Sequence, residues 1–166
     1  MKNNMNWNFD NSYSRLSDVF KEHIEPIAVK NPELVLMNKD LVEELNLDFS
    51  KIDKNELAAL FTGNILPEGS NAIAQAYAGH QFGHFTMLGD GRAVLIGEHL
   101  TKNNERYDIQ FKGSGKTAFS RNGDGRAALG PMLREYIISE AMHHLNIPST
   151  RSLAVAKTGE EIMRET

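Results

Sequence analysis

The sequence predicts an α+β fold, in which a small, mainly antiparallel sheet carries one principal helix and follows a helical N-terminal extension. Ten of the thirteen glycines fall between residues 79 and 130, and strand-like runs separate them. A long amphipathic run follows the glycines, whereas the first 70 residues show only short helical patterns. We therefore divide the chain into an extension, 1–70, and a sheet-and-helix unit, 71–166.

The extension is expected to contain three short helices and no chemical motif. Apolar residues recur at helical spacing in its first half, and Pro26 ends that run. Asn38 and Asp53 stand where helix N-caps belong, and Gly63 stands where a helix C-terminus belongs. The three helices are predicted over residues 16–24, 39–45 and 54–61.

A β-hairpin is the clearest element of the second unit. The runs 93–96 and 106–112 favour strands, and the intervening segment 101–105 contains the turn-forming pair Asn103-Asn104. Two upstream runs, 74–81 and 85–88, are further strand candidates. The sheet is therefore expected to be built mainly from neighbouring antiparallel strands.

The principal helix is predicted over residues 129–145, where apolar side chains follow the i, i+3, i+4, i+7 pattern. Pro131 suits a first helical turn, and Pro148 lies beyond the end. A strand over 152–156, a turn at 158–159 and the start of another strand over 161–164 are expected to follow.

Composition excludes several classes of function. The net charge is −4 and the pI is near 5.9, so we expect no nucleic-acid partner. No cysteine is present, which excludes disulfides and cysteine-bound zinc. No apolar run approaches the roughly 18 residues of a membrane span, and residues 1–13 resemble neither a signal nor a transit peptide. We expect a cytoplasmic protein without membrane contact.

Lys112 is the first candidate for a functional residue. On the predicted strand 106–112, alternation places Lys112 on the polar face, directly before Gly113-Ser114-Gly115. A lysine in that position can meet an anion lying over the sheet. The alternative is a solvated lysine on a half-exposed strand.

Two similar tetrads flank this lysine: Gly89-Asp90-Gly91-Arg92 and Gly123-Asp124-Gly125-Arg126. Glycine allows backbone N–H groups to approach a phosphate, and arginine grips phosphate oxygens with a planar fork. The alternative is that both tetrads are tight turns, because Asp-Gly favours turns. Two copies around a strand lysine favour phosphate binding.

Glu135 supplies a possible partner for the lysine. It lies near the start of the predicted helix, 23 residues after Lys112, and a strand lysine paired with a helix glutamate is the protein-kinase arrangement. The alternative is an exposed charge on the helix surface. His80 and His84 are four residues apart, but their glycine-rich setting argues against a helical metal site, so we predict no metal ligand here.

Several motifs resemble those of one family, the selenoprotein O family. They are Ala78-Gly79-His80-Gln81-Phe82-Gly83, Leu88-Gly89-Asp90-Gly91-Arg92-Ala93, Gln110-Phe111-Lys112-Gly113-Ser114-Gly115, Ser120-Arg121-Asn122-Gly123-Asp124-Gly125-Arg126, Leu133-Arg134-Glu135-Tyr136 and Ile147-Pro148-Ser149-Thr150-Arg151. The resemblance runs from about residue 13 to the end.

The resemblance implies a kinase-like N-lobe belonging to a protein adenylyltransferase, which moves AMP from ATP to Ser, Thr or Tyr hydroxyls of proteins. It implies that ATP is bound with the α-phosphate towards the acceptor and that Mg²⁺ takes part. Glu135 would orient the lysine. The implied ATP-binding residues are Gly89, Gly91, Arg92, Lys112, Asp124 and Gly125.

Family members are longer, and the resemblance places their catalytic base and Mg²⁺ ligands in a second lobe beyond residue 166. We therefore expect no catalytic residue and no metal ligand in this chain, and no AMP transfer by the chain alone. A truncation, a split gene with a separate C-terminal lobe and an expression fragment all remain open. The alternative functions are a non-catalytic nucleotide-binding or regulatory fragment and, once completed, a kinase-type phosphotransferase.

Overall fold

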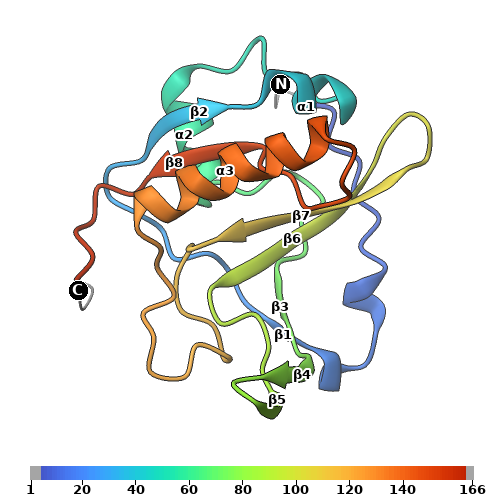
Figure 1. Cartoon of the computed structure of the whole chain (residues 1–166). Coiled ribbons are helices and arrows are strands. Elements are labelled where there is room, and N and C mark those ends of the chain that lie inside the picture. Colours follow the sequence, from blue (N-terminus) through green and yellow to red (C-terminus); the bar gives the residue numbers. More distant parts are fainter. Residues whose placement is uncertain (1–4, 164–166) are drawn as a thin grey trace.

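A computed structural model describes residues 5–163 of the chain, which form a mixed α/β fold (Figure 1). Two 3-10 turns, Tyr13–Arg15 and Asp18–Phe20, precede the first strand. The helices are α1 (Lys39–Glu44), α2 (Lys54–Thr62) and α3 (Leu129–His144), and the strands are β1 (Lys21–His23), β2 (Glu33–Met37), β3 (Ile73–Gln75), β4 (Ala78–Gln81), β5 (His84–Met87), β6 (Ala93–Leu100), β7 (Arg106–Lys112) and β8 (Ala154–Lys157).

The described strands form three small antiparallel sheets, whereas the sequence predicts one small, mainly antiparallel sheet. The largest has the order β1-β3-β6-β7, and the other two are the pairs β2-β8 and β4-β5. Helix α2 packs against β2 and β8, and α3 runs alongside β8 (Figure 1). The β4-β5 hairpin projects from the opposite end of the molecule.

The main core lies beneath α1 and α2, and both helices form where predicted. Asn38 accepts a hydrogen bond from the Leu41 N–H, and Asp53 accepts from the first N–H groups of α2. Gly63 ends α2 with a φ of 82°, in the left-handed region that glycine favours. The buried core residues are Leu41, Val42, Leu45, Leu47, Phe49, Ile52, Leu57 and Leu60.

The predicted hairpin is confirmed, but its first strand extends to Leu100 rather than ending at Ile96. Residues 8–13, which we call the N-terminal strap, run along this extension. Asp10 N–H donates to the Glu98 carbonyl, and Ser12 and Tyr13 both donate to the Glu98 carboxylate. Glu98 and His99 are therefore buried but hydrogen-bonded, and the strand continues through them.

The predicted helix over 16–24 is wrong. The segment forms the turn Asp18–Phe20 and then strand β1, whose backbone pairs with β3 from Lys21 to His23. Its apolar side chains are not buried in the core, since Val19 is 74% exposed and Phe20 is 48% exposed. Pairing with a strand about fifty residues away has overridden the local helical spacing.

Three further differences concern strands. Strand β2 was not predicted; it pairs with β8, far away in the chain. The single strand expected over 74–81 is two strands, because at its break Ala76 N–H donates to the Phe20 carbonyl instead of continuing a ladder. Residues 161–163 form no strand, and Arg164, the end of that predicted strand, lies outside the described residues.

Helix α3 confirms the principal helix but leaves part of its apolar surface exposed. Ile137, Ile138 and Leu145 are each more than 60% exposed. Exposed apolar groups of this kind favour contact with a further polypeptide.

Arg151 links the end of α3 to α1. Its guanidinium lies 2.7 Å from a Glu140 oxygen and 2.8 Å from a Glu44 oxygen. The hydrogen bond from Arg151 holds the pKa of Glu140 below its ordinary value of 4.5. A lowered pKa in the folded state stabilises the fold above the ordinary value, and this contribution is lost as the pH falls through the folded-state pKa.

Glu140→Gln is therefore expected to destabilise the protein by about 1–2 kcal/mol at pH 7, because Arg151 loses a charged acceptor in a mostly buried setting. The difference from the unmodified chain should shrink as the pH falls below 4.5. Urea unfolding of both proteins across this range measures it. Glu33→Gln, which breaks the exposed pair with Lys157, is the control and should change stability by less than about 0.5 kcal/mol. A Glu140→Gln effect that is independent of pH would contradict the assignment.

Candidate nucleotide-binding site

Lys112 and Glu135 form the ion pair expected from their spacing. Lys112 ends β7, and its ammonium lies 2.8 Å from each carboxylate oxygen of Glu135, in the second turn of α3. The two side chains are 42% and 46% exposed, so the pair adds little to stability. Its effect is to fix the position of a cation at the surface, where an anionic ligand can reach it.

The two glycine tetrads have different structures despite their similar sequences. Asp90 is buried, accepts a hydrogen bond from the Gln75 N–H and has its pKa raised by burial. Asp124 is exposed and accepts from the N–H of Arg126, which forms a local turn. The first aspartate therefore holds the tetrad to β3, whereas the second accepts a hydrogen bond within its own loop.

The loop over residues 113–126 joins the two tetrads. Thr117 Oγ1 donates to the Asp90 carbonyl, and Ser120 Oγ donates to the Gly91 carbonyl. At its base, Gly115 N–H donates to the Gly125 carbonyl. This loop, which we call the tetrad loop, brings 89–92 and 123–126 to one side of the molecule. Thr117 and Ser120 were not predicted as site residues, and the signal for them in the sequence is two hydroxyl side chains within a glycine-rich stretch.

The tetrad glycines pack closely against their own chain. A Cβ on Gly89 would lie 2.4 Å from the Phe119 ring, and a Cβ on Gly125 would lie 1.9 Å from the Gly115 carbonyl oxygen. Both residues also have positive φ, 144° and 69°. The missing side chains at these positions are thus required by internal packing, whatever ligand the surface carries.

A large open cavity of about 1250 Å³ lies between β7, α3 and β8, and it includes Lys112 and Glu135. The other predicted ATP-binding residues do not line it; they are Gly89, Gly91, Arg92, Asp124 and Gly125. Of the six predicted ATP-binding residues, Lys112 alone therefore lines the cavity. The tetrad 89–92 adjoins the end of β7 outside the cavity, where Gly113 N–H donates to the Arg92 carbonyl. Ser114 also lies at the cavity, and its buried hydroxyl has no hydrogen-bond partner among the described residues.

The remaining polar candidates also lie outside the cavity lining. Arg92 is exposed, Arg126 lies 2.9 Å from a Glu160 oxygen, and the Arg121 guanidinium lies over the Phe82 ring. His80 and His84 lie on the hairpin strands β4 and β5 rather than on a helix. Across residues 5–163, no group of three potential metal-ligating side chains is close enough to hold a metal ion.

Fold and site together define a mixed α/β protein with a glycine-rich, cationic surface at the end of a small antiparallel sheet. The model of the family described as protein adenylyltransferase SelO matches residues 3–166, and the chain belongs to this family. Within the described range, no helix has both the length and the apolar character that crossing a membrane requires.

Curated relatives support this membership and carry the name protein nucleotidyltransferase YdiU. The protein from Pelagibacter ubique is 75% identical over 96% of this chain. Those from Nitrosococcus oceani and Anoxybacillus flavithermus are 64% and 63% identical over 96% and 98% of it. The chain spans only about a third of their lengths, 33%, 32% and 34% respectively.

Proposed function

We propose that this chain forms the ATP-binding part of a protein adenylyltransferase, with the architecture of a kinase-like N-lobe. The observation that carries the proposal is the Lys112–Glu135 ion pair, which holds a cation beside two glycine tetrads in a member of the SelO family. The completed protein transfers AMP from ATP to Ser, Thr or Tyr hydroxyls of protein substrates and releases pyrophosphate.

Each predicted residue has a role that follows from its chemistry and position. Lys112 binds phosphate oxygens, and Glu135 keeps its ammonium in place. The exposed guanidinium of Arg92 offers a second cationic contact. Gly89 and Gly91 of the first tetrad, with Asp124 and Gly125 of the second, shape the backbone that borders the nucleotide. These fixed charges favour the transition state because negative charge builds up on the phosphates during transfer.

The base that accepts the hydroxyl proton is assigned to the rest of the longer protein. The ligands of Mg²⁺ are assigned to the same part of the longer protein, as the family resemblance implies. When bound, Mg²⁺ would supply electrostatic stabilisation of the phosphates. The chain itself binds and orients the nucleotide.

The position of an isotopic label in ATP tests the reaction class. This chain matches about a third of the Pelagibacter ubique relative, and for the test it is fused to the remaining two thirds of that relative. The fusion is given ATP labelled at either the α- or the γ-phosphate. Protein labelling from the α position alone is expected; labelling from the γ position alone would instead identify a phosphotransferase.

The same labelling experiment on the 166-residue chain, run beside an ATP-binding measurement, separates binding from catalysis. The chain alone is expected to bind ATP weakly and to transfer no label. Robust labelling of a protein by the chain alone would contradict the proposal. ATP binding by the fusion without any transfer would favour the non-catalytic, regulatory alternative.

A further inference from the structure

The β4-β5 hairpin presents an apolar face to solvent at the end of the molecule away from α1 and α2 (Figure 1). Ala78 lies opposite Met87, and His80 lies opposite Phe85, so these four side chains share one face. The rings of His80 and Phe85 contact each other edge to face. Phe85 and Met87 are each more than 60% exposed. Because a two-stranded hairpin has little core of its own, such a face is typical of a surface that binds a partner.

Phe82 occupies the tip of this hairpin in a backbone conformation that an L side chain disfavours. Gln81 pairs with His84, so the connecting loop consists of Phe82 and Gly83, whose φ angles are 60° and 79°. Asn, Asp and Gly are the usual residues in such a turn. The Phe82 ring is more than 60% exposed, so burial within residues 5–163 does not account for a phenylalanine here. An exposed aromatic side chain on a strained backbone indicates a functional position.

Arg121, from the tetrad loop, lies over the Phe82 ring at 5.8 Å from its centroid. Its φ of 51° is also positive. Within the described range it forms no ion pair with a carboxylate. A guanidinium stacked on a ring keeps the N–H donors in its plane, and their fork matches a carboxylate. The contact with Phe82 therefore holds an anion-binding group beside the apolar face.

The hairpin and the tetrad loop differ in charge from the rest of the chain. Residues 71–89 and 109–123 contain no Asp or Glu, although the chain has 22 acidic residues and a net charge of −4. Lys116 and Arg121 of the tetrad loop are both exposed. A partner that is complementary to this end of the fold is therefore acidic as well as apolar.

A protein segment fits this surface better than a membrane does. Attraction to anionic lipid relies on clusters of about four to eight Lys and Arg residues. Residues 71–89 contain neither Lys nor Arg, and the exposed cations of residues 113–123 are Lys116 and Arg121. One stacked guanidinium beside a small apolar face instead matches one carboxylate with apolar neighbours.

We propose that this surface docks an acidic, apolar segment of the protein substrate. A carboxylate of the segment binds Arg121, and its apolar side chains cover Phe85 and Met87. The first glycine tetrad begins two residues after β5, so a segment docked here borders the proposed nucleotide surface. The inference rests on the proposed function, because it assigns the surface to that reaction's acceptor. The hairpin surface consists of Ala78, His80, Phe82, Phe85, Met87 and Arg121.

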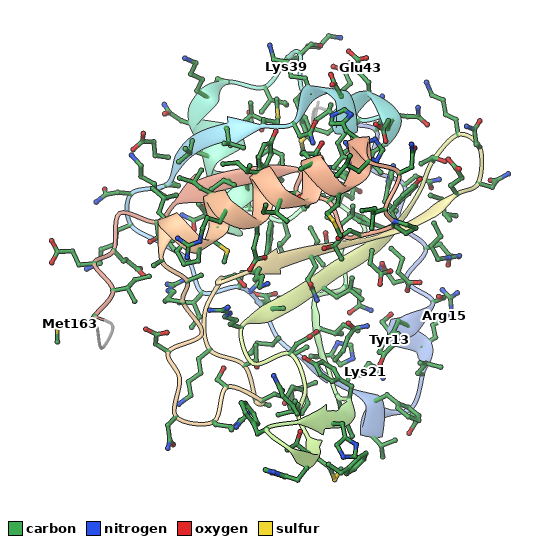
Figure 2. The ribbon with its side chains drawn as sticks, viewed as in Figure 1. Tyr13, Arg15, Lys21, Lys39, Glu43 and Met163 are labelled. Carbon is green, nitrogen blue, oxygen red and sulfur yellow. The ribbon has the colours of Figure 1, made fainter. Side chains whose placement is uncertain are left out.

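Fluorescence anisotropy with two peptide pools tests the charge preference. Each labelled peptide has a central Ser and flanking positions filled with Leu, Phe and either Glu or Lys. The chain should bind the Glu pool at least about fivefold more tightly than the Lys pool. Arg121→Glu should bind the Lys pool at least as tightly as the Glu pool. Lys39→Glu, the same change of charge at the opposite end of the molecule, should keep the original preference (Figure 2).

The apolar part of the surface is tested separately. Phe85→Ser should weaken binding of the Glu pool at least about threefold, because the segment loses apolar contact area. Ile138→Ser removes a similarly exposed apolar side chain from α3 and should leave the affinity unchanged within about 1.5-fold. Equal effects of these two variants would show that the hairpin is not the docking surface.

Transfer by the fusion with the Pelagibacter ubique relative separates this inference from the proposed function. With ATP labelled at the α-phosphate, the Glu pool should have an apparent KM at least about fivefold below that of the Lys pool, and Arg121→Glu should abolish the difference. Preferential binding of the Glu pool without transfer of the α label would remove the proposed function and leave the docking surface in place.

Four results would overturn the docking surface. The first is equal binding of the two pools by the chain, including no binding of either. The second is a preference of the chain that the fusion lacks, which would assign the hairpin surface to the remaining polypeptide. The third is a loss of ATP affinity in Arg121→Glu as large as that in Lys112→Ala, which would assign Arg121 to the nucleotide. The last is binding to vesicles of phosphatidylserine and phosphatidylcholine that Phe85→Ser abolishes, which would assign the surface to a membrane.

Discussion

Replacing Gly125 with alanine is expected to lower the melting temperature by roughly 5–10 °C, since a steric and backbone penalty of about 2–4 kcal/mol has this effect in a domain of this size. The new Cβ would lie 1.9 Å from the carbonyl oxygen of Gly115, and the φ of 69° disfavours any L side chain. Because the atoms nearest this Cβ all belong to the backbone, no side chain can rotate away, and the base of the tetrad loop must open. Thermal unfolding followed by circular dichroism measures the change.

Gly79→Ala is the matched control for this variant. No atom lies within 4 Å of the Cβ position at Gly79, and its φ is not in the positive region. The melting temperature should therefore stay within about 2 °C of the unmodified chain, the range expected for a surface substitution. Equal melting temperatures for the Gly125 and Gly79 variants would show that the tetrad loop tolerates a side chain at its base.

Lys112→Ala is expected to weaken ATP binding at least about tenfold, equivalent to roughly 1.4 kcal/mol, because a charged contact to phosphate is lost. Stability should change by less than about 1 kcal/mol, since the pair with Glu135 is exposed on both sides. Titration calorimetry with ATP, together with urea unfolding, separates these two effects.

Lys157→Ala provides the control for the loss of a surface lysine. Lys157 also pairs with a glutamate, Glu33, at 3.0 Å and is similarly exposed, at 44%. It lies on β8 and belongs to neither glycine tetrad nor the Lys112–Glu135 pair, so ATP affinity should stay the same within about twofold. Equal affinities for the Lys112→Ala and unmodified proteins would remove Lys112 from the nucleotide site.

The elements that could be predicted from the sequence carry local signals. Asn38 and Asp53 cap helices in the positions expected of them, and the Asn103-Asn104 turn joins the predicted hairpin. Strands β1 and β2 carry no such signal, because they are defined by partners about fifty and more than a hundred residues away. Short strands of this kind are specified by tertiary pairing rather than by their own composition.

The candidate site likewise contains residues that local patterns predict and packing that they do not predict. The Lys112–Glu135 pair follows from strand alternation and helix position, both of which are local patterns. The packing of Gly89 against Phe119 could not be predicted, since it depends on how the tetrad loop folds back over residues 89–92. A glycine in such a motif can be required either by a bound ligand or by a neighbouring aromatic ring that packs on it, and the sequence alone does not distinguish these two causes.

The N-terminal strap imposes an order on the folding of this protein. Asn8 donates to the ring of His99, and Ser12 donates to Glu98, across separations of 91 and 86 residues. Because synthesis runs from the N- to the C-terminus, the strap leaves the ribosome before β6 and stays without these partners until β6 has also emerged. Glu98 acquires its hydrogen bonds only when both ends of this segment are present, so completion of this edge of the sheet is a late event with a long loop to close.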